Sequence, residues 1–284
     1  MINTGKMNRL TVIAELPFGF HLSTPDEAER LVTLMLDDAP DNIKKGDEIE
    51  VFVGTDEHGE LVAFPEPPAV MIDETAVLTA VSVTDFGAFF DWGLDKDLLV
   101  KTRQQEFPVH QGMRCLVHVY LDEQTGRLMG ATRLHPFYQE QNHYLHEGDE
   151  VDCQVYAKTQ LGYKVLINKN CLGLIFQSDA FKPLKIGDQT KGFIKTVRED
   201  GKIDVALQPK LHMGRATLEQ QIIDDLEAHG GFSTITDKSP AEDIYKRFNV
   251  SKGAYKKALG SLYKQRRITI NPDMIKLNQE TAKK

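Results

Sequence analysis

One glycine-marked pattern recurs three times in the first three quarters of the chain, and this repeat limits the possible folds more than any other feature. Each copy has an apolar run around a first glycine, a second glycine 25 or 27 residues later, and a turn glycine 13 or 14 residues after that. The landmarks are Gly19, Gly46 and Gly59, then Gly87, Gly112 and Gly126, then Gly162, Gly187 and Gly201. A unit of about 65 residues is a small domain, because solenoid repeats have only about 20–45 residues.

The residues inside each copy follow the pattern of β-strands. Val51 and Val53 alternate with other side chains, as do Val117 and Val119, which is the period of two expected of half-buried strands. The segment DEQTG at residues 122–126 is typical of a hairpin turn. Short strands with regular turns favour a small closed barrel, because closure leaves no unpaired sheet edge.

The C-terminal quarter changes to the periodicity of helices. Apolar residues follow one face of a first helix that ends at Gly230, and a capping box predicts that a second helix begins at Ser239. A third helix is predicted to begin at Ser251, and residues 268–277 have the pattern of two short strands. Three helices followed by a hairpin predict a winged-helix domain.

The net charge of −8 hides an uneven distribution. Residues 210–284 hold 14 Lys and Arg against 9 Asp and Glu, a net charge of +5, whereas residues 1–209 hold 20 against 33, a net charge of −13. Because a partner meets one face of a protein at a time, a basic C-terminal quarter is compatible with a nucleic-acid partner in spite of the acidic total.

The composition and motifs argue against several classes of protein. The sequence has no run of about 20 apolar residues for a membrane span, and its three cysteines have no CxxC spacing for a zinc ribbon. No Walker loop, GxSxG elbow, HExxH helix or dinucleotide fingerprint occurs. We therefore expect a cytoplasmic protein without a secretory signal, enzymatic activity, cofactor, metal or membrane partner.

Three histidines stand close together between the second and third copies. His135, His143 and His146 accompany several aromatic residues there, but no carboxylate or cysteine lies at ligand spacing for a metal. We expect this aromatic link to pack between domains.

The second copy carries the motifs of a known domain. Its Phe-Gly-Ala-Phe strand at residues 86–89, its glycine-opened third strand and its Asp-to-Arg turn at residues 122–127 are similar to the S1 RNA-binding domain over roughly residues 70–133. The resemblance implies a five-stranded OB-fold barrel. The flanking copies share the spacing but have lost several signature side chains, so we expect degenerate S1-like barrels there.

With the C-terminal quarter included, the whole chain resembles the conserved virulence factor B family, which joins S1-like domains to a winged helix. The resemblance implies a multidomain, mainly β protein with three S1-like OB barrels and an α+β winged-helix domain. The expected domains are residues 1–66, 67–136, 144–210 and 212–280. It also implies RNA binding and a post-transcriptional influence on bacterial genes, such as virulence regulation.

The second barrel is the expected RNA-binding platform. Single-stranded nucleic acid is held by aromatic faces on which bases stack. The resemblance implies that Phe86 and Phe89 face outward as the stacking pair while Phe90 points into the barrel, and the alternative is that all three are core residues. Asp122 and Arg127 match the family's Asp and Arg beside this surface, and an ion pair that closes the turn between them is the alternative.

One stretch of the second barrel departs from the family pattern. The family's histidine falls on Val100, so one usual nucleic-acid contact is missing. Lys101 and Arg103 bring positive charge to the same stretch, and we include both in the expected RNA-binding surface.

The flanking copies have different residues at the stacking positions. The first copy has Phe18 and His21 there, and the third has Leu161 and Lys164. We expect the first barrel to be structural or to face another protein. The third can still contact phosphates through its lysines, which are Lys164, Lys191, Lys195 and Lys202.

The third helix of the winged-helix domain is the expected recognition helix. Its basic residues are Lys252, Lys256, Lys257, Lys264, Arg266 and Arg267. They predict contact with nucleic acid, and the alternatives are a solvated basic face or a surface that docks protein.

The sequence thus predicts a non-enzymatic protein that binds single-stranded RNA. The choice of RNA over DNA rests on the resemblance alone, because stacking does not discriminate between them. One rival is a DNA-binding regulator that acts through the winged helix. Another is an accessory subunit that docks on a ribosome or ribonuclease through its acidic barrels.

Overall fold

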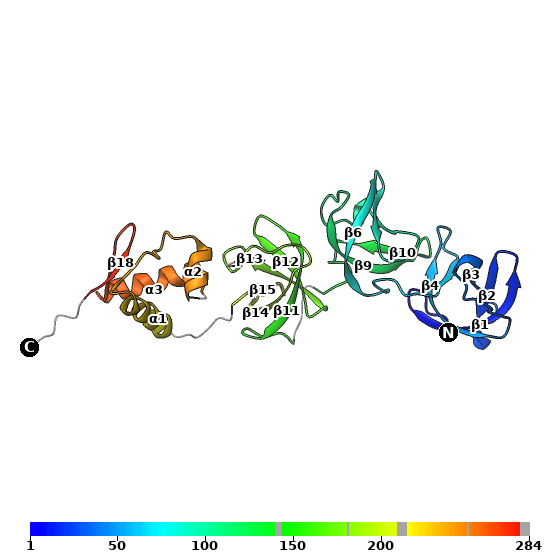
Figure 1. Cartoon of the computed structure of the whole chain (residues 1–284), viewed down its shortest axis with the longest axis horizontal. Helices are drawn as coiled ribbons and strands as arrows, with labels where there is room; N and C mark the ends of the chain where they lie inside the picture. Colours follow the sequence, from blue (N-terminus) through cyan, green and yellow to red (C-terminus); the bar gives the residue numbers. More distant parts are fainter. Residues whose placement is uncertain (140–143, 181, 209–214, 249, 279–284) are drawn as a thin grey trace, which may run out of the picture. The chain divides into compact units, whose positions relative to one another are not determined.

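The structure is a computed structural model that describes residues 1–139, 144–180, 182–208, 215–248 and 250–278 (Figure 1). The chain forms two compact units, Met1–Phe137 and Tyr138–Lys284. Among the described residues, the first unit holds two five-stranded sheets, and the second holds a third such sheet followed by the helices. The predicted fold class, small β barrels followed by a winged helix, is confirmed.

The first sheet closes on itself. Its strands are β1 (Met7–Leu16), β2 (Gly19–Ser23), β3 (Val32–Met35), β4 (Glu48–Thr55) and β5 (Leu61–Phe64). They pair in the order β1-β2-β3-β5-β4, and β1 completes the ring by pairing with β4. A bulge between Val12 and Ala14 bends β1, which lets one strand serve both walls of the barrel. Apolar side chains such as Leu22, Leu34 and Val53 fill the interior.

The third sheet repeats this topology. Its strands are β11 (Glu150–Lys158), β12 (Gly162–Ile167), β13 (Cys171–Phe176), β14 (Gln189–Val197) and β15 (Ile203–Ala206). The order is β11-β12-β13-β15-β14, again with a parallel pair and with a bulge in the first strand, between Val155 and Ala157. The shared order confirms the repeat that the glycine spacing predicts.

The second sheet has the same strands but an incomplete ladder. Its strands are β6 (Thr75–Thr84), β7 (Gly87–Asp91), β8 (Leu98–Lys101), β9 (Arg114–Asp122) and β10 (Arg127–Ala131). Their order is β10-β9-β6-β7-β8, and among these described strands β8 and β10 share no ladder. A short 3₁₀ helix, Thr102–Gln104, follows β8 directly. Hydrogen bonds beyond the ends of β8 and β10 close the gap between these two strands. The amides of Thr132 and Arg133 both donate to the Gln104 carbonyl at 3.0 Å. The strands also pack closely, since a Cβ added at Gly130 would lie 2.8 Å from Val100 Cγ2.

The first glycine of each copy is required by a neighbouring strand. A Cβ at Gly87 would lie 2.5 Å from the carbonyl oxygen of Val100. A Cβ at Gly19 or Gly162 would meet a carbonyl oxygen of the next strand in the same way. No other residue type fits at these positions, which is why the landmark recurs.

The predicted domain limits at residues 66, 136, 144, 210 and 212 stay a prediction. The strands and helices lie inside these limits without defining where one folding unit stops and the next starts.

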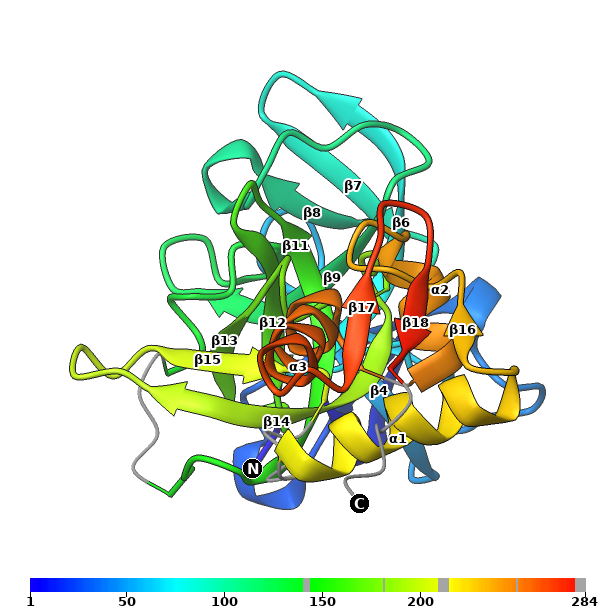
Figure 2. The same cartoon turned by 90° about the vertical axis from the view of Figure 1, so that its left-hand side faces the viewer.

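The C-terminal elements form a winged helix (Figure 2). They are α1 (Arg215–Ala228), β16 (Phe232–Ser233), α2 (Ala241–Phe248), α3 (Lys252–Lys264), β17 (Ile268–Ile270) and β18 (Ile275–Leu277). The helices share one apolar core, and β17 and β18 pair as the predicted hairpin. The hydroxyl of Ser251 accepts the amide of Ala254 at 3.2 Å, which confirms the predicted start of the third helix. Among the described helices, none combines the length and the apolar character needed to cross a membrane.

The predicted cap of the second helix is wrong by one residue. The helix begins at Ala241, and the carbonyl of Pro240 accepts the amide of Ile244 at 3.3 Å. The hydroxyl of Ser239 accepts the amide of Thr236 instead, at 2.9 Å. A serine hydroxyl that bonds a neighbouring turn is no longer available to cap a helix.

Gly260 offers a test of helix stability in α3. It lies in the middle of the helix, and nothing lies within 4 Å of a Cβ added there. Because glycine loses more backbone entropy than alanine on folding, we expect Gly260→Ala to raise the free energy of unfolding of this domain by about 0.5–1 kcal/mol. Hydrogen exchange of the α3 amides measures the change.

The matched control is Gly231→Ala. Gly231 also has open space around a Cβ, but its φ of +88° is one that alanine rarely adopts. We expect this variant to be destabilised, and a destabilised Gly260→Ala would contradict the explanation for α3.

Candidate nucleic-acid interface

The phenylalanines of the second barrel face opposite sides of β7. Phe90 is 0% exposed and lies in the core, as the resemblance implies. Phe86, just before β7, is 60% exposed, and Phe89 is half-buried. The rings of Phe86 and Phe89 meet edge to face, with their centroids 5.8 Å apart. The predicted outward pair therefore exists as one aromatic surface, and the alternative that all three rings are core residues is wrong.

Asp122 is held by Lys101, so the alternative in which it pairs with Arg127 is wrong. Lys101 Nζ lies 2.6 Å from Asp122 Oδ2, and Oδ1 accepts the amide of Gln124 at 3.1 Å. The hydrogen bond from Lys101 is the main cause that holds the pKa of Asp122 below its ordinary value, against the effect of burial. Asp122 is only 7% exposed, so it orders the β9–β10 turn more than it offers a contact.

Two arginines remain available as cations on this barrel. Among the described residues, neither Arg103 nor Arg127 makes a salt bridge. Arg103 is exposed and Arg127 is half-buried. Arg127 pairs with Asp122 across β9 and β10, which places both side chains on the same face of the sheet.

An open depression of about 450 Å³ lies beside the exposed ring. Its lining residues are Asp85, Phe86, Leu99, Lys101, Thr102, Arg103 and Gln124. The amide of Thr102 donates to the Phe86 carbonyl at 3.0 Å, so the end of β8, with Lys101, and the turn after it, with Arg103, lie next to the ring. Three predicted residues, Phe86, Lys101 and Arg103, thus share one site, whereas Leu99, Thr102 and Gln124 were not predicted.

The first barrel has no cation at the equivalent place. Gly19 pairs with Met35 in the register in which Gly87 pairs with Lys101. Phe18 is 53% exposed, so one aromatic position is kept. Glu60 occupies the position of Arg127 by the spacing of the repeat.

Three of the four predicted lysines of the third barrel lie close to carboxylates. Lys195 lies 2.6 Å from Asp179, and Lys202 lies 3.1 Å from Asp200. Lys191 is similarly placed 2.8 Å from an aspartate of β11. These three predicted phosphate contacts are therefore largely neutralised within the barrel.

An aromatic residue of the third barrel was not predicted. Phe176 pairs with Gly162, so it takes the place that Lys101 has in the second barrel. Lys195 and Arg198 lie over its ring, at 5.9 and 5.6 Å from the centroid. The register of the repeat was the signal that could have found it.

At its start the link after the second barrel packs on that barrel, and the expected packing between domains stays a prediction. The ring of Phe137 lies 4.4 Å from that of His118 and 4.9 Å from that of Tyr120. Burial lowers the pKa of His118 to about 4, so its ring is neutral at pH 7. His143 lies outside the described residues, and within the part that is described no cluster of three His, Cys, Asp or Glu side chains could hold a metal.

The basic residues on and after α3 differ in whether another described group binds their charge. Lys252 donates to the carbonyl of Lys238 at 3.3 Å, and Lys256 lies 3.8 Å from Asp237. Lys257 and Lys264 are exposed and make no salt bridge among the described residues. Arg266 and Arg267 are also exposed and follow the helix directly.

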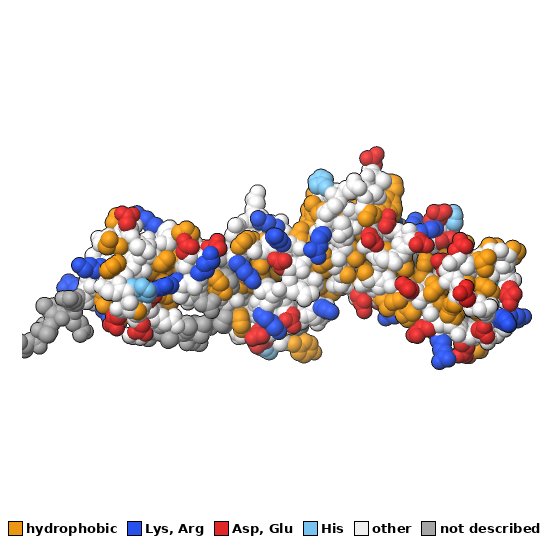
Figure 3. Space-filling model, in the orientation of Figure 1, with side chains coloured by type: hydrophobic (Ala, Val, Ile, Leu, Met, Phe, Trp, Pro, Cys, Tyr) orange, Lys and Arg blue, Asp and Glu red, His pale blue; other side chains and the backbone are white. Residues whose placement is uncertain are grey.

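Charge is unevenly spread over the surface (Figure 3). In this view basic and acidic side chains are interspersed on the winged-helix domain, and acidic side chains are prominent on the first barrel. On the face shown, the winged-helix domain therefore has no single large positive patch.

Two models of known domain families match the chain, one near each end. The S1 domain model matches residues 4–63, and the CvfB-like winged helix domain model matches residues 220–277. The S1 match falls on the first barrel, which has fewer of the signature side chains than the second.

Similar proteins cover most of the chain. Uncharacterized protein YitL of Bacillus subtilis is 26% identical over 276 residues, which is 93% of this chain and 90% of that protein. Conserved virulence factor B of Staphylococcus epidermidis is 25% identical over 247 residues, or 84% and 83% of the two chains. A crystal structure described as a multidomain protein with nucleic acid binding domains from Streptococcus pneumoniae is 22% identical, covers 97% and 98%, and has a TM-score of 0.42.

The two matched domains belong to nucleic-acid-binding families, and none of these findings points to an enzyme. The resemblance to the conserved virulence factor B family is thereby confirmed: the chain is a relative of conserved virulence factor B, with an S1 domain at its start and a CvfB-like winged-helix domain near its end.

Proposed function

We propose that the chain is a non-enzymatic RNA-binding protein, a post-transcriptional regulator in the bacterial cytoplasm, whose main binding surface is on the second barrel. The observation that carries this proposal is the exposed ring of Phe86, set edge to face with Phe89 beside a depression lined by Lys101 and Arg103. An aromatic ring that protrudes into solvent next to basic side chains is the arrangement that single-stranded nucleic acid requires.

Aromatic and basic residues would make different contacts on this surface, the rings with bases and the cations with phosphates. A base stacked on an exposed aromatic ring contributes about 1–3 kcal/mol, whichever base it is. The guanidinium groups of Arg103 and Arg127 can each contact a phosphate, since no salt bridge engages them among the described residues. Lys101 contributes less charge, because Asp122 already neutralises it.

Parallel titrations test the kind of nucleic acid. Single-stranded RNA, single-stranded DNA of the same sequence and duplex DNA would be compared at one salt concentration, because phosphate contacts make every affinity depend on salt. We expect single-stranded RNA to bind most tightly. Cross-linking in cells followed by sequencing gives the same comparison in vivo, and enrichment of duplex DNA at discrete sites would contradict the proposal.

The winged helix supports a second candidate, contact with duplex DNA through α3. The observation in its favour is that Lys257 and Lys264 are exposed and carry charge that no described carboxylate neutralises. They are seven residues apart, so about two helical turns bring them to one face. A recognition helix in a major groove needs such side chains on its outer face.

Replacing both lysines separates the two candidates. If α3 contacts duplex phosphates, we expect Lys257→Ala with Lys264→Ala to lower the salt dependence of duplex binding, the slope of log K against log salt, by about 1.8. Binding of single-stranded RNA should change by less than about twofold, because the stacking surface is on another domain.

The matched control is Lys246→Ala in α2. This lysine is paired with Glu242 at 2.9 Å, so its charge is already neutralised. If RNA binding is lost together with duplex binding in the α3 variant, the two surfaces do not act separately.

A further inference from the structure

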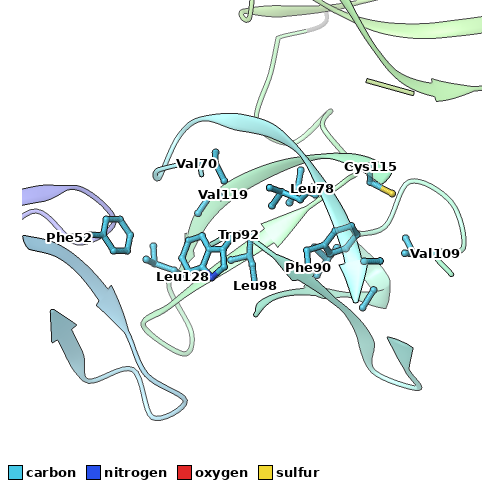
Figure 4. Packing of buried hydrophobic residues seen from close by; sticks show 14 residues of the cluster. Phe52, Val70, Leu78, Phe90, Trp92, Leu98, Val109, Cys115, Val119 and Leu128 are labelled. Carbon is cyan, nitrogen blue, oxygen red and sulfur yellow. The ribbon is translucent and has the colours of Figure 1, made fainter. Parts of the chain in front are cut away.

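The first barrel contributes one of its side chains to the apolar core of the second barrel. Phe52 of β4 projects out of its own barrel and is 0% exposed, because the second barrel covers it. Its ring meets that of Trp92 edge to face, with the centroids 6.0 Å apart. Figure 4 shows Phe52 pointing toward Trp92 and Leu128, which is a core residue of β10. The candidate RNA surface is therefore built on a strand that the first barrel supports.

A hydrogen bond and a close backbone approach from the first barrel fall on either side of Arg127. β10 is an edge strand, and the amide of Leu128 donates to the hydroxyl of Thr55, at the end of β4, at 2.8 Å. On the other side the Thr125 carbonyl packs against Gly59, where a Cβ would lie only 2.5 Å from that oxygen. Gly59 also has a φ of +86°, so both its conformation and its space require glycine.

The side chain of Arg127 has no salt bridge of its own among the described residues. Its neighbour across the ladder, Asp122, is bonded to Lys101. The backbone of β10, which the first barrel contacts at Leu128 and near Thr125, fixes the place and the sheet face from which the Arg127 side chain extends.

We infer that the first barrel positions Arg127 for contact with nucleic acid, and that Thr55 and Gly59 are the positioning residues. The inference rests on the proposed function, in which Arg127 contacts a phosphate. The first barrel thereby has a role in RNA binding although its own surface lacks the cations for it. Met35 and Glu60 stand where the second barrel has Lys101 and Arg127.

A double-mutant cycle in the full chain tests the inference. Thr55→Val keeps the shape of the side chain but removes the hydroxyl that Leu128 donates to. We expect it to weaken binding of single-stranded RNA by about threefold to tenfold, and Thr55→Ser, which keeps the hydroxyl, to bind like the parent chain. In a chain that already carries Arg127→Ala, Thr55→Val should weaken binding by less than about twofold.

The salt dependence supplies a readout that a merely structural role would not change. If one phosphate contact is lost, the slope of log K against log salt falls by about 0.7 for single-stranded nucleic acid, in Thr55→Val as in Arg127→Ala, with no further fall in the double variant. The matched control is Thr33→Val, since Thr33 lies on β3 and pairs with His21 and Val62 within the first barrel.

The outcomes separate this inference from the proposed function. If Phe86 and Phe89 prove irrelevant to RNA binding, the proposed function fails. If they matter, three other results would each overturn the positioning role alone. Arg127→Ala could leave RNA affinity unchanged, or Thr55→Val could weaken binding as much in the Arg127→Ala chain as in the parent chain. The third such result is an unchanged slope of log K against log salt in Thr55→Val. Should Thr55→Val fail to fold in thermal melts, Gly59→Ala displaces the Thr125 carbonyl from the other side, and the same loss of affinity and slope is expected.

Discussion

We expect Phe86→Ala combined with Phe89→Ala to weaken the binding of single-stranded RNA at least about tenfold while the protein stays folded. Two lost stacking contacts correspond to about 2–6 kcal/mol, and about 1.4 kcal/mol is already a factor of ten in affinity. Because Phe86 is 60% exposed, its removal from the fold should cost little stability. Titration of labelled RNA at fixed salt measures the effect.

The control for this variant is Leu161→Ala in the third barrel. Leu161 holds the position of Phe86 in the repeat and is 64% exposed, yet it has no aromatic face. We expect its removal to leave RNA binding unchanged. Thermal melts accompany both titrations, because Phe89 is half-buried and a buried phenylalanine costs about 3–5 kcal/mol when it is truncated to alanine. Unchanged affinity in a folded double variant would move the binding site off the second barrel.

The second large effect is expected at Phe52, the side chain that the first barrel contributes to the core of the second. Phe52→Ala removes a fully buried ring that contacts Trp92, so we expect it to lower the free energy of unfolding by about 3–5 kcal/mol. The cavity opens between the barrels, so amides of both β4 and β10 should exchange their hydrogens faster. Hydrogen exchange read separately on the two strands measures this.

Phe18→Ala is the matched control, because Phe18 lies in the same barrel but is 53% exposed. We expect it to change the free energy of unfolding by no more than about 0.5 kcal/mol. If Phe52→Ala accelerates exchange in β4 but leaves β10 unchanged, the core of the second barrel does not depend on Phe52, and the positioning of Arg127 by the first barrel loses its basis.

Local patterns predicted most of the fold. The glycine spacing predicted three related barrels, because a neighbouring carbonyl excludes a Cβ at Gly87 and its equivalents. Strand alternation and the S1 resemblance together placed Phe90 inside the barrel and Phe89 on its outer face, since neighbouring residues on a strand face opposite sides. These features depend on residues that are close in sequence or fixed by backbone geometry.

The tertiary structure decided the electrostatics of the candidate site. Lys101 and Asp122 are 21 residues apart and belong to strands that are not adjacent in the sheet order, so no spacing rule pairs them. Their salt bridge leaves Arg103 and Arg127 as the cations of the surface. In the same way Phe176 of the third barrel is found only when the strand register is known.

The sequence by itself determined the repeat and the winged helix, because each follows from periodicity, a cap or a glycine. The outward orientation of Phe86 and Phe89 followed from the S1 resemblance. Only the tertiary structure decided what covers the outer faces of the barrels. Alternation puts Phe52 on the side of β4 opposite to Val51 and Val53, where a barrel standing alone would expose it. The second barrel buries that ring, and Thr55 of the first barrel holds the edge of β10 beside Arg127. Both contacts depend on how two barrels meet and not on the order of residues in either.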